Sequence, residues 1–330
     1  MSPATPQRAL ITGVSGQDGS YLAELLLAEG LEVHGIVRRP ADRDSPNLDA
    51  VRGSLRLHQG DLLEKGMLRA VIDSTGPNEI YHLAAPAFVP DSWAAAAATM
   101  QSIATLTAEL IDAVRDHVPR ARVVVATSRE IFAADAPSPQ REDSPCSPSS
   151  PYGVAKLAAH QIVGLLRDHN GLHLSSAILF NHESPRRRPE FVSRKVTRAA
   201  AAISLGQEDQ LTLGDTDAVR DWSAAIDVVH GLRLMAAAPE PGDYVLASGV
   251  GRTVRELVDV AFACVGLDGE RYVRVDPGLV RPREAEAAVG DATRARERLG
   301  WRARTTFEQL IAEMVAADLA STERAGSTAG

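Results

Sequence analysis

A turn with three glycines near the amino end limits the possible fold more than any other stretch. The apolar residues 8–12 lead directly into the turn that holds Gly13, Gly16 and Gly19, and an apolar-periodic segment follows through residue 27. A strand, a glycine turn and a helix in this order let the backbone approach a pyrophosphate, which the amino end of the helix faces. The spacing differs from the Gly-x-Gly-x-x-Gly of many dehydrogenases, but its context predicts a dinucleotide-binding unit.

The strand expected next, at residues 32–37, indicates which dinucleotide binds. It ends in Arg38 and Arg39, where a site for NAD usually has a carboxylate for the ribose hydroxyls. Two guanidinium groups suit the additional phosphate of NADP. The alternative is that both arginines are simply solvated at the end of the strand. Further strands are expected at residues 55–58 and 80–85. The first ends near Asp61, whose carboxylate could meet an adenine, and the second ends in small residues that admit a nicotinamide ribose.

Residues 151–156 contain the pair with the clearest chemical meaning. Tyr152 and Lys156 are four positions apart, so on a helix they lie on one face. Ser149 and Ser150 can cap that helix, and Pro151 suits its first position. A nearby ammonium favours the charged form of a phenol, so Tyr152 should accept a proton near neutral pH. That is what the oxidation of an alcohol requires, but a solvated pair on a helix surface has the same spacing.

Two further candidates follow the apolar residues 123–127, which we expect to form a strand. Ser128 and Glu130 leave the carboxyl end of this strand, and ligands bind at that edge of open parallel sheets. A solvated loop carboxylate is the alternative for Glu130. The residues that follow, 136–151, are rich in proline and serine, and so short a connection suits an active-site loop better than a domain linker.

Strands and helices alternate regularly as far as residue 180, and this order predicts an α/β fold. We expect a Rossmann-like doubly wound parallel sheet with a smaller α/β substrate-binding lobe. The NADP-binding Rossmann domain would span residues 1–180, with 223–250 returning to it, and the lobe would comprise 181–222 and 251–330. Basic residues concentrate in 186–198 and at 281–283, where they could hold a diphosphate or form a solvated basic face.

Composition excludes several classes of protein. A chain of 330 residues with 35 basic against 43 acidic side chains is not the basic protein that binds nucleic acid. Cys146 and Cys264 lack metal-binding spacing, which predicts reduced thiols, a cytoplasmic location and no metal. No run of about eighteen apolar residues occurs, so we expect no membrane partner.

Taken together, these motifs resemble the extended short-chain dehydrogenase/reductase family of nucleotide-sugar enzymes, and within it the GDP-mannose 4,6-dehydratases. The resemblance runs from about residue 8 to residue 314. It is carried by residues 9–27, 33–39 and 220–222, by Arg281-Pro and by Gly290-Asp291. The segment Asn-His-Glu-Ser-Pro-Arg-Arg at 181–187 is far more specific than the glycines, which the whole superfamily shares.

The resemblance implies roles for individual residues. Ser128, Glu130, Tyr152 and Lys156 match the catalytic positions. The NADP-binding site would be formed by Gly13, Gly16, Gln17, Asp18, Gly19, Arg38, Arg39, Asp61, Leu62, Leu83, Ala84, Ala85, Tyr152 and Lys156. A nucleotide diphosphate sugar would be surrounded by Phe88, Arg129, Asn181, Glu183, Arg187, Lys195, Arg220 and Arg281.

The implied reaction converts GDP-mannose, or a close analogue, to GDP-4-keto-6-deoxymannose. Tyr152 takes the proton of the 4-hydroxyl while a hydride leaves C4 for NADP, and the ketone acidifies the C5 proton. Glu130 removes that proton, water leaves from C6, and the hydride returns to C6. The enzyme is therefore a lyase without net redox change. The resemblance also implies a homodimer formed through residues 94–114 and 152–168, or a homotetramer.

Some positions depart from the dehydratase pattern. Arg129 stands where a serine or an aspartate is usual, and a guanidinium there should stabilise the Glu130 carboxylate and weaken it as a base. Ala87 and Phe88 replace a polar pair, and Ile103 replaces an asparagine. These changes keep an alternative open, an NAD(P)-dependent nucleotide-sugar 4-epimerase with the same tyrosine and lysine chemistry. A nucleotide-binding protein without catalysis is the third reading.

Overall fold

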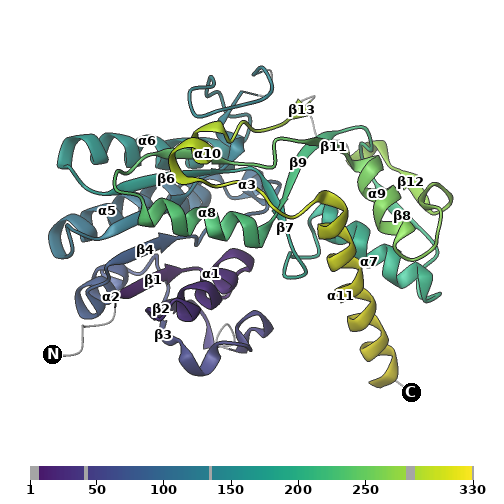
Figure 1. Cartoon of the computed structure of the whole chain (residues 1–330), viewed down its shortest axis with the longest axis horizontal. Coiled ribbons are helices and arrows are strands. Elements are labelled where there is room, and N and C mark those ends of the chain that lie inside the picture. Colours follow the sequence, from purple (N-terminus) through teal and green to yellow (C-terminus); the bar gives the residue numbers. More distant parts are fainter. Residues whose placement is uncertain (1–6, 41–43, 134–135, 280–286, 329–330) are drawn as a thin grey trace.

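The computed structural model describes residues 7–40, 44–133, 136–279 and 287–328. A seven-stranded parallel sheet forms its centre (Figure 1), with the order β10-β6-β5-β4-β1-β2-β3. The strands are β1 (Arg8–Thr12), β2 (Glu32–Val37), β3 (Arg56–Gln59), β4 (Glu79–His82), β5 (Arg122–Ala126), β6 (Leu174–Leu179) and β10 (Asp243–Leu246).

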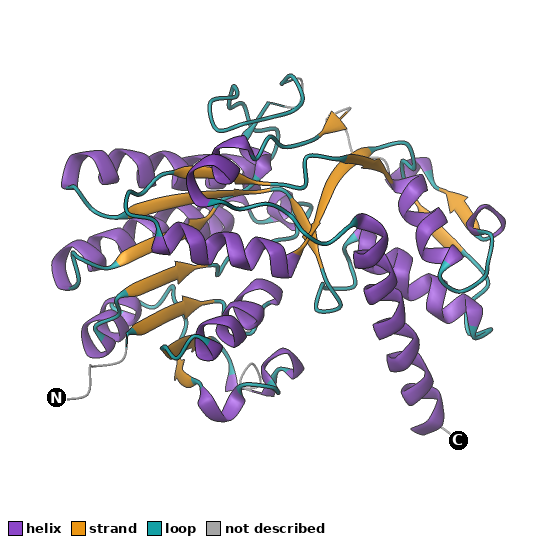
Figure 2. Ribbon diagram, viewed as in Figure 1, coloured by secondary structure: helices purple, strands orange, loops and turns teal. Residues whose placement is uncertain are grey.

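Helices cover both faces of this sheet (Figure 2), because the strands are apolar on both sides. On one face lie α1 (Gln17–Ala28), α8 (Ala225–Ala237) and α10 (Thr293–Leu299), and on the other lie α2 (Met67–Thr75), α5 (Leu106–His117) and α6 (Pro151–Asn170). Leu22 and Leu26, four apart on α1, are fully buried against Val229 and Leu232 of α8. The predicted doubly wound α/β fold is confirmed.

The strand order reverses between β1 and β4. The chain passes from β1 outward to β2 and β3, and then returns to place β4 on the other side of β1. At such a reversal the loops leave in opposite directions and open a crevice beyond the carboxyl ends of the strands. The glycine turn and the residues after β4 therefore lie on either side of one crevice.

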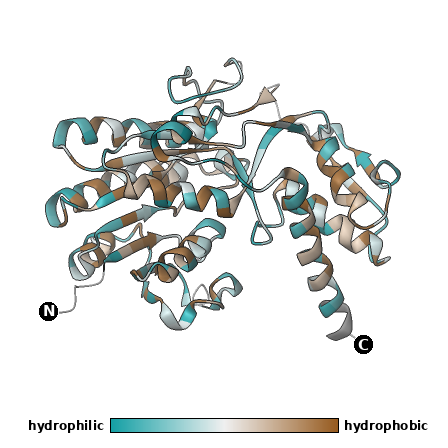
Figure 3. Cartoon of the chain, in the orientation of Figure 1, coloured by the Kyte–Doolittle hydropathy of each residue, from teal (hydrophilic) through white to brown (hydrophobic). Residues whose placement is uncertain are grey.

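A second lobe contains two smaller sheets and its own apolar core. Its strands are β7 (Asn181–Glu183), β8 (Leu211–Leu213), β9 (Val219–Ala224), β11 (Gly251–Thr253), β12 (Val273–Val275) and β13 (Ala287–Ala288), and its helices are α7 (Val192–Ser204), α9 (Val254–Ala263) and α11 (Phe307–Thr328). Trp222 and Phe307 stack in this core with ring centroids 5.7 Å apart. Figure 3 shows hydrophobic residues along the central strands and on the inward faces of the helices.

Helix α10 does not join this second lobe, although it lies within residues 251–330. It packs on α8 and β10, with Ala295 and Trp301 in the core of the large sheet. The indole nitrogen of Trp301 donates a hydrogen bond of 2.7 Å to the Asp227 carbonyl, which ties this segment to α8. The exact boundaries of the two lobes stay a prediction.

The stretch that contains residues 94–114, which the resemblance implies for subunit contact, is not one continuous helix. It comprises α3 (Asp91–Ala94), α4 (Ala96–Met100), a π-helical turn (Gln101–Thr105) and α5. Ala95 has non-helical backbone angles and ends α3, and the Thr107 hydroxyl bonds to the Ile103 carbonyl at 2.6 Å within the widened turn. Short 3-10 turns occur at Pro46–Leu48, Arg52–Ser54, Arg129–Ile131, Gly269–Arg271 and Pro277–Leu279.

Two features are absent from the described residues. None of their helices combines the length and the apolar character that crossing a lipid bilayer needs. Nor do their histidine, cysteine and acidic side chains form a group of three or more that could hold a metal ion.

Candidate functional site

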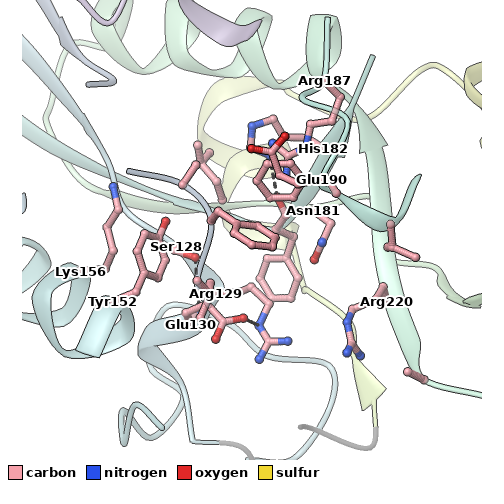
Figure 4. A pocket seen from close by; sticks show the side chains of 18 of the residues that line it. Ser128, Arg129, Glu130, Tyr152, Lys156, Asn181, His182, Arg187, Glu190 and Arg220 are labelled. Atoms are coloured by element: carbon pink, nitrogen blue, oxygen red, sulfur yellow. Dashed lines mark hydrogen bonds and ion pairs between the residues drawn. The ribbon is translucent and has the colours of Figure 1, made fainter. Parts of the chain in front are cut away.

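A cavity of about 380 Å³ opens at the carboxyl ends of β4, β5 and β6, between the large sheet and the second lobe. Figure 4 shows that side chains from both parts of the molecule point into it. Among the residues predicted from the sequence, it is lined by Asp18, Leu83, Ala85, Phe88, Ser128, Arg129, Glu130, Tyr152, Lys156, Asn181, Arg187, Lys195 and Arg220.

The start of helix α6 brings the four candidate catalytic residues together. Ser150 caps this helix, because its hydroxyl accepts a 3.0 Å hydrogen bond from the Gly153 amide. A Cβ at Gly153 would lie only 2.4 Å from the Glu130 carbonyl oxygen, so only glycine allows the helix to approach the β5 loop this closely. Tyr152, one residue earlier, is thereby placed beside that loop.

Ser128 begins the short 3-10 turn that carries Glu130. Its hydroxyl accepts a 3.2 Å hydrogen bond from the Glu130 amide, which fixes both residues at the end of β5. In Figure 4, Ser128 lies between the Tyr152 ring and the Glu130 carboxylate. A proton acceptor for an alcohol and a second carboxylate base thus face one cavity.

Burial shifts the pKa values of both Tyr152 and Lys156. Burial raises the pKa of Tyr152 to about 12, and the hydrogen bond with Ser128 offsets only part of that rise. Burial also lowers the pKa of Lys156 to about 8. The Lys156 ammonium donates to the Ala126 carbonyl at 2.7 Å and lies 5.8 Å from the centre of the Tyr152 ring. Burial thus outweighs any such effect in the protein alone, and the expectation that this ammonium makes Tyr152 a better proton acceptor stays a prediction.

Arg129 and Glu130 form the opposite wall of the reactive end. Arg129 is 8% exposed, and its Nε lies 3.7 Å from the Glu130 Oε1. Figure 4 shows both side chains at the same edge of the cavity. The departure from the dehydratase pattern thus places a cation directly beside the second base.

The glycine turn suits a dinucleotide phosphate. A Cβ at Gly19 would lie 2.3 Å from the Gly13 carbonyl oxygen, so no larger residue allows α1 to begin this close to β1. Gly16 is the N-cap residue, and in the described part of the chain no side chain caps that end of α1. Its first amide groups can therefore bind an anion. The residues present fit a bound nicotinamide dinucleotide at this turn.

The other predicted cofactor residues lie at the same edge of the sheet. Arg38 and Arg39 follow β2 and are exposed, and Asp61 and Leu62 follow β3. Directly after β4, the amides of Leu83 and Ala84 donate to the Thr12 hydroxyl at 3.1 and 3.2 Å, and Ala85 follows them into the cavity wall. Four neighbouring strands thus present these residues along one crevice.

Comparison with known proteins agrees with this geometry. A family model described as GDP-mannose 4,6 dehydratase matches residues 10–314. The GDP-mannose 4,6-dehydratase of Sinorhizobium fredii is 42% identical, over 94% of this chain and 96% of that protein. This chain belongs to the GDP-mannose 4,6-dehydratase family. The GDP-mannose 4,6 dehydratase of Homo sapiens is 39% identical, over 94% of this chain and 91% of that protein.

The family lies within the extended short-chain dehydrogenase/reductases, and solved structures share its fold. The UDP-glucose 4-epimerase of Thermus thermophilus, solved in complex with NAD, superposes with a TM-score of 0.81. The two sequences are 25% identical, and the match covers 94% of this chain and 99% of the epimerase chain. The resemblance to the family inferred from the sequence motifs is thus confirmed.

The substrate side of this family member is built on an aromatic stack. The Arg187 guanidinium carbon lies 3.5 Å from the centre of the Phe191 ring, and Phe88 packs edge-on against Phe191 at 5.6 Å. All three side chains line the cavity. Glu183 does not line it. Its carboxylate lies behind Arg187, 3.0 Å from the Arg187 Nε, and accepts a hydrogen bond from Ser193.

Two further cations line the same end of the cavity. Lys195 donates to the Thr212 carbonyl and Arg220 to the Val219 carbonyl, each at 2.6 Å. Asn181, at the start of β7, lines the cavity as well. Arg281 lies outside the described residues. Of the predicted basic cradle in 186–198, Arg187 and Lys195 thus line the cavity, and Arg220 of β9 joins them there.

Several cavity residues were missed by the sequence reasoning. Phe191 and Glu190 precede α7, a helix that the sequence pattern did not reveal, and His182 lies inside the family-specific segment. Only the specificity of that segment could have pointed to His182. The two predicted cofactor residues Gln17 and Asp18 bond to this segment, since Gln17 donates to the His182 carbonyl and Asp18 accepts from its ring.

Proposed function

We propose that this protein is an NADP-dependent 4,6-dehydratase that converts GDP-mannose, or a close analogue, to GDP-4-keto-6-deoxymannose. The observation that carries this proposal is the convergence of Ser128, Glu130 and Tyr152 on one cavity whose other end holds three cations. A site of this kind has a proton acceptor for an alcohol, a second base, and a place for a diphosphate. Family membership supports the same reaction.

The crevice between β1 and β4 would hold the cofactor. Its pyrophosphate would lie on the amino end of α1, and Arg38 and Arg39 favour the additional phosphate of NADP. When bound, NADP would supply a positively charged nicotinamide that accepts the C4 hydride, returns it to C6, and lowers the pKa of the nearby phenol.

The first step falls to Tyr152. Its phenolate takes the proton of the sugar 4-hydroxyl, and the Ser128 hydroxyl beside it can hold the sugar oxygen in place. Lys156, fixed by the Ala126 carbonyl, supplies positive charge under the reacting groups. The product of this step is a 4-ketone, which acidifies the neighbouring C5 proton.

The second step falls to Glu130. Its carboxylate removes the C5 proton and then donates it to the C6 oxygen, so the C6–O bond breaks and water leaves. The resulting C5–C6 double bond takes up the hydride at C6 and, at C5, the proton of Tyr152 after exchange with solvent. This gives the 4-keto-6-deoxy sugar and restores the Tyr152 phenolate. Arg129 would make this step slower than in relatives with an uncharged neighbour, because it stabilises the Glu130 carboxylate.

A second copy of the chain is the proposed partner, as a homodimer or homotetramer. Trp93, Val154 and Leu165 are 67%, 45% and 70% exposed, and the alanines at 94–98 beside Trp93 are exposed as well. These residues belong to α3, α4 and α6, the region that the resemblance implies for subunit contact. Light scattering of the purified protein would test this assembly. A cytoplasmic location remains a prediction.

The deciding experiment is product mass spectrometry after incubation with NADP⁺ and GDP-mannose in deuterium oxide. A product that has lost one water and gained one deuterium at C5 supports the dehydratase. Glu130→Gln should then abolish the loss of water. An unchanged sugar composition with inverted C4 would overturn the proposal in favour of the 4-epimerase. That alternative is supported by Arg129 beside Glu130, since epimerisation at C4 needs no C5 base.

A further inference from the structure

The cofactor turn and the substrate strand are bonded directly to each other. Gln17 of α1 donates to the His182 carbonyl at 3.1 Å and accepts from the Ser184 hydroxyl at 2.8 Å. Further along α1, Arg186 contacts the Ser20 hydroxyl at 3.0 Å and the Glu24 carboxylate at 2.6 Å. Side-chain hydrogen bonds therefore connect helix α1 directly to the segment from β7 onward, although more than 160 positions separate them in the chain.

At the cavity end of this contact lies an ion pair. The Nε2 of His182 is 2.9 Å from the Asp18 Oδ2, and its Nδ1 is 2.7 Å from the Phe180 carbonyl oxygen. A carbonyl and a carboxylate only accept hydrogen bonds, so both ring nitrogens carry a proton. Burial opposes both charges, but the pairing raises the pKa of His182 and lowers that of Asp18. Below its raised pKa the ring is therefore held as an imidazolium ion.

We propose that His182 is a positioning residue that couples cofactor binding at the glycine turn to nucleotide-sugar binding at Asn181. This inference rests on the proposed function, since it assigns both ligands to this cavity. Asp18 lies in the first turn of α1, where a bound pyrophosphate would fix the helix, and His182 follows Asn181 directly on β7. Fixing Asp18 fixes the imidazolium ion and, through it, the Asn181 amide.

Such coupling is reciprocal and depends on pH. The cofactor should tighten nucleotide-sugar binding by the same factor by which the sugar tightens cofactor binding. The charged and titratable groups around the pair are Arg187, which follows β7, and Tyr152 and Lys156 of α6, which face Asp18. Because the pKa of His182 is raised, the ion pair is complete below 6.5 and is lost as pH rises through the higher folded pKa. On the acid side it is lost only below pH 3.8, as Asp18 takes up a proton.

The test is calorimetric titration of GDP-mannose into the full chain, with and without saturating NADP⁺. All proteins carry Tyr152→Phe so that the sugar is not consumed. We expect NADP⁺ to tighten binding about tenfold in this background, and His182→Gln or Asp18→Asn to reduce the effect to within about twofold of none. The double variant should add nothing further, because both changes remove the same ion pair.

The matched control is Glu24→Gln, which removes an ion pair between the same two segments but away from the cavity. It should leave the coupling unchanged. Coupling that survives in both His182→Gln and Asp18→Asn would overturn the inference. If His182→Gln fails to fold, Asp18→Asn decides alone, since coupling that survives this substitution would also overturn the inference.

Turnover separates this inference from the proposed function. In the protein with Tyr152 intact, His182→Gln should raise the KM for GDP-mannose about tenfold and leave kcat within about twofold, because His182 does not touch the reacting atoms. A chain that binds both ligands with coupling but releases no water would overturn the dehydratase proposal and retain the inference. A working dehydratase whose KM is insensitive to His182→Gln would retain the dehydratase proposal and overturn the inference.

Discussion

The two ends of the cavity are built in different ways. At the reactive end, Ser128 lies directly after β5, and Tyr152 and Lys156 lie in the first two turns of α6, which packs on the large sheet. At the binding end, Arg187, Lys195 and Arg220 come from three separate segments of the second lobe. The reactive end is thus local and deeply buried, whereas the binding end is assembled from distant parts of the chain.

Because the two ends differ in this way, we expect residues at the reactive end to affect the catalytic rate and residues at the binding end to affect substrate affinity. Buried groups with perturbed ionisation act on the proton of the substrate, so changes there should lower kcat. In the proposed function, cations that also bond to backbone carbonyls or to Glu183 would hold the diphosphate in ground and transition state alike, so changes there should raise KM. Variants at either end test whether the cavity is divided in this way.

The largest effect is expected for Tyr152→Phe. Loss of the phenolic oxygen removes the proton acceptor, so kcat should fall about 10³-fold, while KM stays within about twofold. Steady-state kinetics with GDP-mannose measures both. Tyr244→Phe is the matched control, because Tyr244 is buried on β10 and does not line the cavity. A KM that rises as much as kcat falls would contradict the division of the cavity into a reactive end and a binding end.

Lys156→Met should lower the rate at neutral pH by about 10²-fold. The ammonium favours the phenolate of Tyr152 in the complex with the cofactor, so without it the pKa of Tyr152 rises. The pH profile of kcat should therefore shift towards alkaline pH, and raising the pH should recover part of the activity. A uniform loss at all pH values would mean that Lys156 acts only by supporting the fold through Ala126.

At the binding end, Arg187→Lys should raise KM about tenfold with little change in kcat. Lysine keeps the charge but loses the planar group that stacks on Phe191 and pairs with Glu183. Arg188→Lys is the control, since the Arg188 side chain is 61% exposed and does not line the cavity. An equal effect of both substitutions would show that only net charge matters there.

The smallest effect is expected for Phe191→Leu. Its ring covers the Arg187 guanidinium and contacts Phe88, and a cation–π contact contributes about 0.5–1 kcal/mol. KM should therefore rise about threefold, with an unchanged melting temperature, since the ring is not in either main apolar core. A decrease in kcat instead would place Phe191 at the reactive end.

Much of the reactive end could be predicted because its signals are local. The glycine turn between β1 and α1, the cap at Ser150 and the spacing of Tyr152 and Lys156 depend on neighbours within a few residues. Ser128 and Glu130 follow from their place at the end of a parallel strand. Such features are set by backbone geometry, which a short stretch of sequence specifies.

The sequence by itself determined the doubly wound sheet and the identity of the reactive groups, because periodicity and turn residues act over short distances. Only the tertiary structure decided that Lys156 faces Ala126, that Glu183 lies behind Arg187, and that His182 pairs with Asp18. The last two residues lie 164 positions apart in the chain. Their pairing depends on how two lobes pack, and no local pattern encodes it.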